Sequence, residues 1–300
     1  MKNRNLLSIT LLFIISMIFL SSCAKQIEPQ ETEDDTDALV KTIDLGDRQM
    51  DYFRFGNKDG EKLVILPGLA LKSVMGSAEA VVAAYEIFAE DYDVYMFDHI
   101  KEEPEGYNIE QMAEDTLRAF DKLGLKHVNF MGVSLGGMIA LVIGINDPEY
   151  IDRMILCSAS ADVVNSDRSA FEDWDRYARE RNTTALMESF GEYIYSPEFY
   201  EMYKDIILSS GDGATELDYN NFIISNEAIM NFNVYDQLDK IKCPLFVIGA
   251  DKDKVLGVKA SYDIVDKLGC KYYIYENSYH GVYDEAPDYR ERIKEFLQNN

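Results

Sequence analysis

The stretch GVSLGG at residues 132–137 lies between two apolar runs, Val128 to Val133 and Leu135 to Ile145. The first run has the length of a buried strand, and the second has the length of a buried helix. So tight a turn leaves no space for side chains at the first two glycines of the stretch, and its strained backbone lifts the hydroxyl of Ser134 clear of the sheet. This G-x-S-x-G pattern, placed before a helix N-terminus that favours negative charge, predicts that Ser134 is a nucleophile.

Strand-like and helical segments alternate on both sides of this turn. The expected strands span residues 40–45, 50–55, 62–66, 94–97, 128–133, 154–157, 245–248 and 272–275. The expected helices span residues 73–90, 109–123, 135–145, 258–268 and 289–297, and Asn108 with Gln111 forms a capping box before the second one. This alternation predicts an α/β fold: a mainly parallel, eight-stranded sheet with helices on both faces and an antiparallel edge made by the two opening strands.

The rhythm of strands and helices is interrupted between residues 161 and 235. Long helical stretches rich in Phe, Tyr and Trp replace the alternation there. Ligands bind at the carboxyl ends of the strands in open α/β sheets, and we expect the insertion to lie over that edge. The sequence thus predicts an α/β core at residues 41–160 and 236–300, with a helical cap at 161–235.

A serine nucleophile needs a general base, and the chain has only three histidines. His127 begins the strand that leads into the serine turn, so it should lie at the opposite end of the sheet from Ser134. His99 follows the strand at 94–97, but it precedes the serine and no suitable acid follows it. His280 follows the last expected strand and should lie at the carboxyl edge of the sheet. His280 is therefore the predicted base.

The base in turn needs a carboxylate to orient it, and the segment GADKDKVLG at residues 249–257 offers two. Either would give the chain order serine, acid, histidine. Asp253 lies farther along the loop and has the better reach to the imidazole, with Val255 able to pack back as an anchor. Asp251 is the alternative; the carboxylate that does not serve is expected to be a solvated loop residue or a turn cap.

The chain resembles the α/β-hydrolase superfamily, in the branch with a helical cap after the sixth strand, over roughly residues 41–300. Four motifs carry the resemblance: LPGL at 66–69, the serine turn at 132–137, the acidic segment at 249–257 and HGVYDEAP at 280–287. Relatives usually place the triad acid in a Gly-x-x-Asp-x-Val/Ile-x-Pro stretch. DKVLG at 253–257 matches its end, with Gly257 where proline is common, so the resemblance also implies Asp253 as the acid.

The resemblance implies further parts of the site. By position, the backbone amides of Leu69 and Leu135 would form the oxyanion hole, and the triad needs no metal or organic cofactor. One loop departs from the family pattern: many relatives carry Asp-x-Arg-Gly-x-Gly-x-Ser after the fourth strand, where this chain has DHIKEEP at 98–104. That loop lines the substrate pocket in relatives, so no relative's substrate is carried over.

The expected function is that of a serine hydrolase, carboxylesterase-like, which cleaves a carboxylic ester or related acyl bond through an acyl-enzyme. Peptidase or C–C bond hydrolase activity on the same triad is the first alternative. A surface binding protein that kept the fold without turnover is the second, although such a binder has no need for the pair Ser134 and His280.

The N-terminus has the pattern of a bacterial export signal. Lys2 and Arg4 precede an apolar run at 6–20, which ends in LSSC at 20–23 and resembles a lipobox. We expect a signal peptide at 1–22, lipidation of Cys23 and an acidic, disordered tether at 23–40, with an uncleaved anchor as the alternative. The protein would then be held on the outer side of a bacterial cell membrane.

Composition narrows the choice of partner. The formal net charge is −25, from 54 acidic and 29 basic residues, which argues against nucleic acid as a ligand. The aromatic-rich cap and the lack of a clustered cationic clamp predict a small, neutral, partly apolar acyl substrate. Apart from Cys23, the cysteines Cys157, Cys243 and Cys270 are expected to be free thiols, and none has the spacing of a zinc site.

Overall fold

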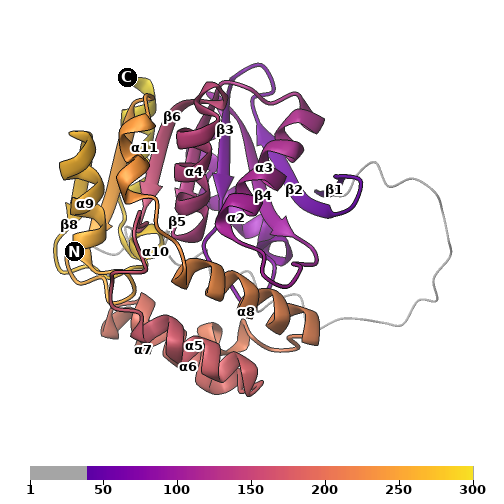
Figure 1. The fold of residues 1–300 in the computed structure, drawn as a ribbon, viewed down its shortest axis with the longest axis vertical. Helices are drawn as coiled ribbons and strands as arrows, with labels where there is room; N and C mark the ends of the chain where they lie inside the picture. The colour runs from indigo at the N-terminus through magenta and orange to yellow at the C-terminus, as the bar shows by residue number, and fades with distance from the viewer. Residues whose placement is uncertain (1–38, 300) are drawn as a thin grey trace, which may run out of the picture.

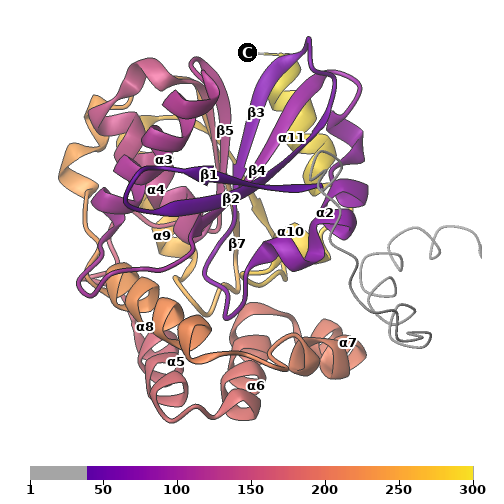
Figure 2. The same ribbon diagram turned by 90° about the vertical axis from the view of Figure 1, so that its right-hand side faces the viewer.

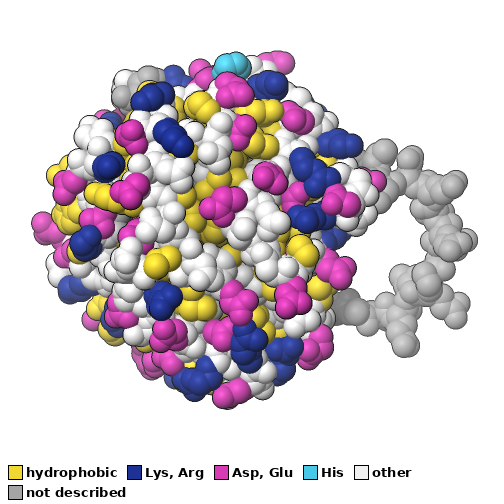
Figure 3. Space-filling model, viewed as in Figure 1, with side chains coloured by type: hydrophobic (Ala, Val, Ile, Leu, Met, Phe, Trp, Pro, Cys, Tyr) yellow, Lys and Arg dark blue, Asp and Glu magenta, His cyan; other side chains and the backbone are white. Residues whose placement is uncertain are grey.

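The computed structural model describes residues 39–299. The predicted signal peptide at 1–22, the lipidation site Cys23 and nearly all of the predicted tether lie outside these residues. Within them, no helix combines the length and the hydropathy needed to cross a membrane. On the face shown in Figure 3, Lys and Arg side chains are interspersed with Asp and Glu side chains and form no basic patch.

The core is one eight-stranded sheet in the order β1-β2-β4-β3-β5-β6-β7-β8 (Figure 1). β1 and β2 pair antiparallel, β2 pairs antiparallel with β4, and every other neighbouring pair is parallel. The predicted fold is confirmed, including the antiparallel edge at the start of the chain. The strands are β1 Val40–Asp44, β2 Gln49–Gly56, β3 Glu61–Leu66, β4 Tyr92–Ile100, β5 Val128–Val133, β6 Ile151–Cys157, β7 Leu245–Ala250 and β8 Lys271–Tyr275.

Two apolar clusters cover the two faces of this sheet. One cluster includes buried residues of α3 Ile109–Leu123, α4 Leu135–Asn146 and α9 Val258–Leu268. The other includes buried residues of α2 Ala78–Ala84, α10 Val282–Glu285 and α11 Tyr289–Gln298. Burial on both faces explains why the central strands read as continuous apolar runs rather than alternating ones.

Local signals account for most helix boundaries. The predicted capping box is present in α3: the Asn108 side chain accepts from the Gln111 amide at 2.9 Å, and the Gln111 side chain accepts from the Asn108 amide. The continuous helix expected at 73–90 is wrong: the segment is divided into η1 Val74–Ser77, α2 and η2 Glu86–Phe88. Gly76 has low helix propensity, and the Ser73 hydroxyl accepts from the Met75 amide, which starts a separate turn.

Four further helices, α5 Ser169–Arg179, α6 Thr183–Ile194, α7 Pro197–Ser209 and α8 Glu216–Met230, form a cap between β6 and β7. Figures 1 and 2 show them together at one end of the sheet. Trp174 is buried among the rings of Phe171, Phe190 and Tyr193 and forms the aromatic centre of the cap. The insertion is closed at its base, because Asp162 bridges to Asn233 in antiparallel fashion.

Candidate active site

Ser134 occupies a strained turn between β5 and α4. Its backbone angles are φ 49° and ψ −112°, a conformation that residues with a Cβ rarely adopt and that costs on the order of 1–3 kcal/mol. A Cβ at Gly132 would lie 2.4 Å from the Gly136 carbonyl oxygen, and a Cβ at Gly136 would lie 2.4 Å from the Leu66 carbonyl oxygen. The collision predicted for the two glycines is confirmed, and the backbone of the turn is fixed by these close contacts.

Asp253 and His280 meet at the same edge of the sheet. His280 Nδ1 lies 2.9 Å from Asp253 Oδ2, and the two side chains are only 3% and 4% exposed. The other carboxylate oxygen of Asp253 accepts from the amides of Val255 at 2.8 Å and Leu256 at 3.0 Å. Burial alone would raise the pKa of Asp253, but the charge and hydrogen bond of His280 and the two amides outweigh it and hold that pKa below its ordinary value.

The competing carboxylate, Asp251, is exposed and faces a different loop. One of its oxygens accepts from the Ser278 amide at 3.2 Å, so it ties the loop after β7 to the loop after β8. Of the two carboxylates, the structure brings Asp253 to His280 and leaves Asp251 in the turn.

Ser158 links the histidine loop to the strand next to the one that ends at Ser134, and sequence reasoning missed it. In the β5–β6 register Val133 lies opposite Cys157, so Ser134 and Ser158 follow at neighbouring strand ends. Ser158 Oγ donates to the His280 carbonyl oxygen at 2.7 Å. A polar residue directly after a buried strand was the signal that could have pointed to it.

The hydroxyl of Ser134 and the imidazole of His280 are not hydrogen-bonded to each other within residues 39–299. Such bonds are often long in enzymes without substrate and tighten in the Michaelis complex. The strand register and the Ser158 contact still bring both residues to one edge of the sheet.

The two expected oxyanion donors lie on segments that touch the serine turn. Leu135 is the first residue of α4, where an amide has no partner inside the helix. Leu69 follows Gly68, at which a Cβ would lie 3.1 Å from Ser134 Cβ. The Gly136 amide donates to the Pro67 carbonyl at 3.1 Å and holds this loop against the helix N-terminus.

A cavity of about 260 Å³ opens beside that loop, between the end of β4 and cap helix α8. Much of its wall is apolar, with contributions from Leu69, Val74, Ile100, Leu217 and Phe222. Two cations also line it, but both are already engaged: Lys72 donates to the Asp212 carbonyl at 2.9 Å, and Lys101 pairs with Asp51 at 3.0 Å.

Two titratable groups of the loop at 98–104, which differs from the family pattern, line the same cavity. Burial lowers the pKa of His99, and its Nε2 atom has no hydrogen-bond partner among the described residues. Burial raises the pKa of Glu103 to about 8, and both of its carboxylate oxygens lie within 2.9 Å of Ser225 Oγ on α8. Sequence reasoning did not single out Glu103, because nothing in DHIKEEP distinguishes a buried glutamate from an exposed one.

The remaining histidine and the cysteines lie apart from this chemistry. His127, directly before β5, has a side chain that is 69% exposed and pairs with Asp152 at 3.1 Å. Cys157 is buried, Cys243 and Cys270 are half-buried, and all three are free thiols. In the part of the chain that the structure describes, no group of three or more His, Cys, Asp or Glu side chains could hold a metal ion.

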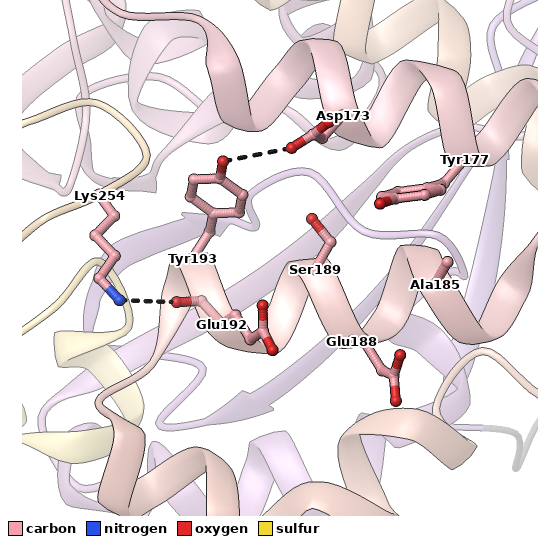
Figure 4. A pocket seen from close by; sticks show the side chains of 8 residues that line it. All are labelled: Asp173, Tyr177, Ala185, Glu188, Ser189, Glu192, Tyr193 and Lys254. Carbon is pink, nitrogen blue, oxygen red and sulfur yellow. Dashed lines mark hydrogen bonds between the residues drawn. The ribbon is translucent and has the colours of Figure 1, made fainter.

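A second hollow lies in the cap itself, between α5 and α6 (Figure 4). In Figure 4, Tyr193 points toward Asp173, with its hydroxyl 3.5 Å from the carboxylate. Lys254 reaches in from the loop of Asp253 and donates to the Glu192 carbonyl at 3.3 Å. This hollow therefore borders the loop that carries the acid of the candidate triad.

Known proteins share this fold and this sequence pattern. The family described as alpha/beta hydrolase fold matches residues 62–186. The 3-oxoadipate enol-lactonase 2 of Acinetobacter baylyi is 22% identical over 217 residues, covering 72% of this chain and 80% of that protein. The putative carbamate hydrolase RutD of Stutzerimonas stutzeri is 22% identical over 213 residues, covering 67% and 80%.

Solved structures agree with the sequence match. The enol-lactonase of Burkholderia xenovorans superposes with a TM-score of 0.76 at 18% identity, covering 86% of this chain and 100% of that one. At this identity the likeness speaks for the fold. The described residues have the α/β-hydrolase fold, and residues 62–186 match the family of that name.

Proposed function

We propose that the protein is a serine hydrolase that cleaves a carboxylic ester or related acyl bond. Ser134 is the nucleophile, His280 the general base and Asp253 the acid that orients it. The observation that carries the proposal is the buried 2.9 Å contact between His280 Nδ1 and Asp253, at the sheet edge where the strained turn presents Ser134.

The mechanism follows from the roles of these groups. His280 removes the proton from Ser134 Oγ, which attacks the carbonyl carbon and forms a tetrahedral oxyanion. The amides of Leu69 and Leu135 donate to that oxyanion, and the loss of one such donor typically costs ~3 kcal/mol of barrier. His280 then protonates the leaving alkoxide, and a water molecule repeats the attack on the acyl-enzyme.

Asp253 must remain ionised while the imidazolium forms. Its lowered pKa supports this role, because the carboxylate keeps its charge at neutral pH and stabilises the imidazolium beside it. Its second oxygen is fixed by two amides, so the acid has one orientation and holds His280 in one tautomer.

We propose a neutral, partly apolar acyl group as the substrate portion next to Leu69. The cavity there is largely apolar, and its two lysines are engaged with protein oxygens rather than free to clamp an anion. The names of the relatives, an enol-lactonase and a putative carbamate hydrolase, support acyl transfer to water but leave the acyl group open.

A fluorophosphonate probe tests the nucleophile. The domain should be labelled covalently, and Ser134→Ala should abolish labelling, as detected by intact mass. Ser209→Ala, on the exposed end of α7, is the matched control and should label like the parent. Equal labelling of the Ser134→Ala protein would show that another residue reacts.

A substrate panel tests the bond and the acyl group. Uncharged short and medium acyl esters should have higher kcat/KM than dicarboxylate or phosphorylated esters, and higher than amides or aminoacyl arylamides. A preference for an anionic ester would contradict the neutral pocket, and a preference for the arylamides would indicate a peptidase instead.

We further propose that Cys23 is lipidated and that the protein is held on the outer side of a bacterial cell membrane. The support is the pattern of the sequence at residues 2–23 alone. Expressed in a bacterium, the protein should partition with membranes and carry a lipid mass on Cys23, whereas Cys23→Ser should not. An unmodified Cys23 in the mature protein would contradict this assignment.

A further inference from the structure

The end of cap helix α6 is fastened to the loop that carries His280. Three consecutive cap residues contact three residues that follow the histidine, and we call this set the cap latch: Ile194, Tyr195 and Ser196 with Gly281, Asp284 and Glu285. The latch attaches the histidine loop to the cap, whereas Ser158 attaches the same loop to the end of β6.

The latch holds the backbone immediately after the base. Ile194 is the last residue of α6, where a carbonyl has no partner inside the helix, and it accepts from the Gly281 amide at 2.8 Å. The Tyr195 ring packs against the same glycine, since a Cβ there would lie 2.7 Å from two of its ring carbons. A side chain at this position, directly beside His280, would have to displace the Tyr195 ring.

Side-chain hydrogen bonds complete the latch. Tyr195 Oη donates to Asp284 at 2.8 Å, and the amide and hydroxyl of Ser196 donate to the two oxygens of Glu285 at 2.9 and 2.5 Å. The bond from Lys254 to the Glu192 carbonyl, visible in Figure 4, attaches the acid's loop to the same helix end. Both loops of the candidate pair therefore rest on one turn of the cap.

We propose that Tyr195 is a positioning residue: through the cap latch it sets where the imidazole of His280 lies relative to Ser134. The inference rests on the proposed function. Ser158 holds the His280 carbonyl from the sheet and the latch holds the next residue from the cap, so the imidazole is located between two anchors. The cap then contributes to the geometry of proton transfer as well as to the substrate cavity.

Two substitutions separate the parts of the latch. Tyr195→Phe removes the bond to Asp284 and keeps the ring against Gly281, and Tyr195→Ala removes both. We expect kcat to fall about tenfold in the first variant and about 10²-fold in the second with KM nearly unchanged, because displacing a reacting group by ~1 Å costs about that much. Arg181→Ala is the control: it breaks an ion pair to Glu216 at 2.8 Å inside the cap, away from the latch, and should keep the parent kcat.

A proton NMR measurement provides the readout that loss of stability alone would not change. The downfield signal of the His280 Nδ1 proton, bound by Asp253, should broaden or shift in both Tyr195 variants and stay unchanged in Arg181→Ala. A folded Tyr195→Phe protein with the parent kcat and the parent signal would overturn the proposal, as would an equal loss of kcat in the control. If the parent enzyme does not react with the fluorophosphonate, the proposed function fails, and the NMR comparison still decides whether Tyr195 positions His280.

Discussion

The sheet edge and the helical cap meet around the same histidine, yet they hold their residues in different ways. At the sheet edge the backbone itself fixes Ser134, because carbonyl oxygens lie where any side chain at Gly132 or Gly136 would have to go. The cap is attached to the histidine loop by one backbone bond, from Gly281 to Ile194, and otherwise by contacts that involve side chains, such as those of Tyr195 and Ser196. A backbone contact permits one arrangement, whereas side-chain contacts can be weakened one at a time, so substitutions at the edge should have all-or-none effects and those in the cap graded ones.

The largest expected effect distinguishes the two carboxylates at the sheet edge. Asp253→Asn leaves His280 without the acceptor that sets its tautomer, and such a loss lowers kcat by about 10⁴ in the best-studied triad. Asp251→Asn removes only an exposed contact to the Ser278 amide and should cost little. Steady-state kinetics on proteins of equal thermal stability checks the ranking, and the reverse order would move the acid to Asp251.

Two glycine-to-alanine substitutions compare the sheet edge with the cap, at positions where an added Cβ would lie almost equally close to its nearest neighbour. A Cβ at Gly136 would meet backbone, the Leu66 carbonyl oxygen at 2.4 Å, while a Cβ at Gly191 in α6 would meet the Tyr200 ring at 2.3 Å. A ring can move and a sheet carbonyl cannot, so Gly136→Ala should destabilise by about 3 kcal/mol and slow probe labelling. Gly191→Ala should cost about 1 kcal/mol, because helix propensity offsets part of the clash. Thermal unfolding measures both changes in stability. Equal losses in the two variants would contradict the proposed difference between the sheet edge and the cap.

The smallest expected effect concerns the contact between the loop after β4 and cap helix α8. Burial raises the pKa of Glu103 from an ordinary 4.5 to about 8, so the folded state holds this proton more tightly than the unfolded chain does. The stability that this protonation supplies is present in full below the ordinary pKa of 4.5 and is lost progressively as pH rises from there through about 8. Glu103→Gln keeps an acceptor for Ser225 without the charge and should gain on the parent by about 2–4 °C in Tm above pH 8.

That difference should vanish near pH 4, where the parent glutamate is protonated in both states. A pH series of unfolding temperatures for the two proteins measures it. A constant offset across the series would show that Glu103 does not titrate in this range.

The sequence predicted what local patterns control. The eight strands, the capping box at Asn108 and the turn at Ser134 each depend on a few adjacent residues, and the structure has them where the pattern indicated. The strand β4 is longer than expected, at Tyr92–Ile100 against 94–97, because its ends pair with β3 and with β2. The hydrophobic pattern within one segment does not show which other strands its end residues will pair with.

The parts of the site that escaped prediction are contacts between distant segments. Ser158 and His280 are 122 positions apart, and Tyr195 and Asp284 are 89 apart. Each residue is ordinary in its own neighbourhood: a serine after a strand, a tyrosine at a helix end. Only the folding of β6, α6 and the histidine loop onto one another brings them into contact, and the spacing of residues within one segment does not predict such contacts.

The antiparallel bridge from Asp162 to Asn233 has a consequence for how the cap can be lengthened, shortened or exchanged. The insertion departs and returns through one pair of adjacent residues, with the Val163 amide on the Phe232 carbonyl at 2.9 Å and the Val234 amide on the Ala161 carbonyl at 2.8 Å. Its length can therefore change by whole helices without displacing either flanking strand. If Tyr195 has the proposed positioning role, a transplanted cap would bring its own contacts to the histidine loop, and we expect a cap exchange to change kcat as well as substrate preference.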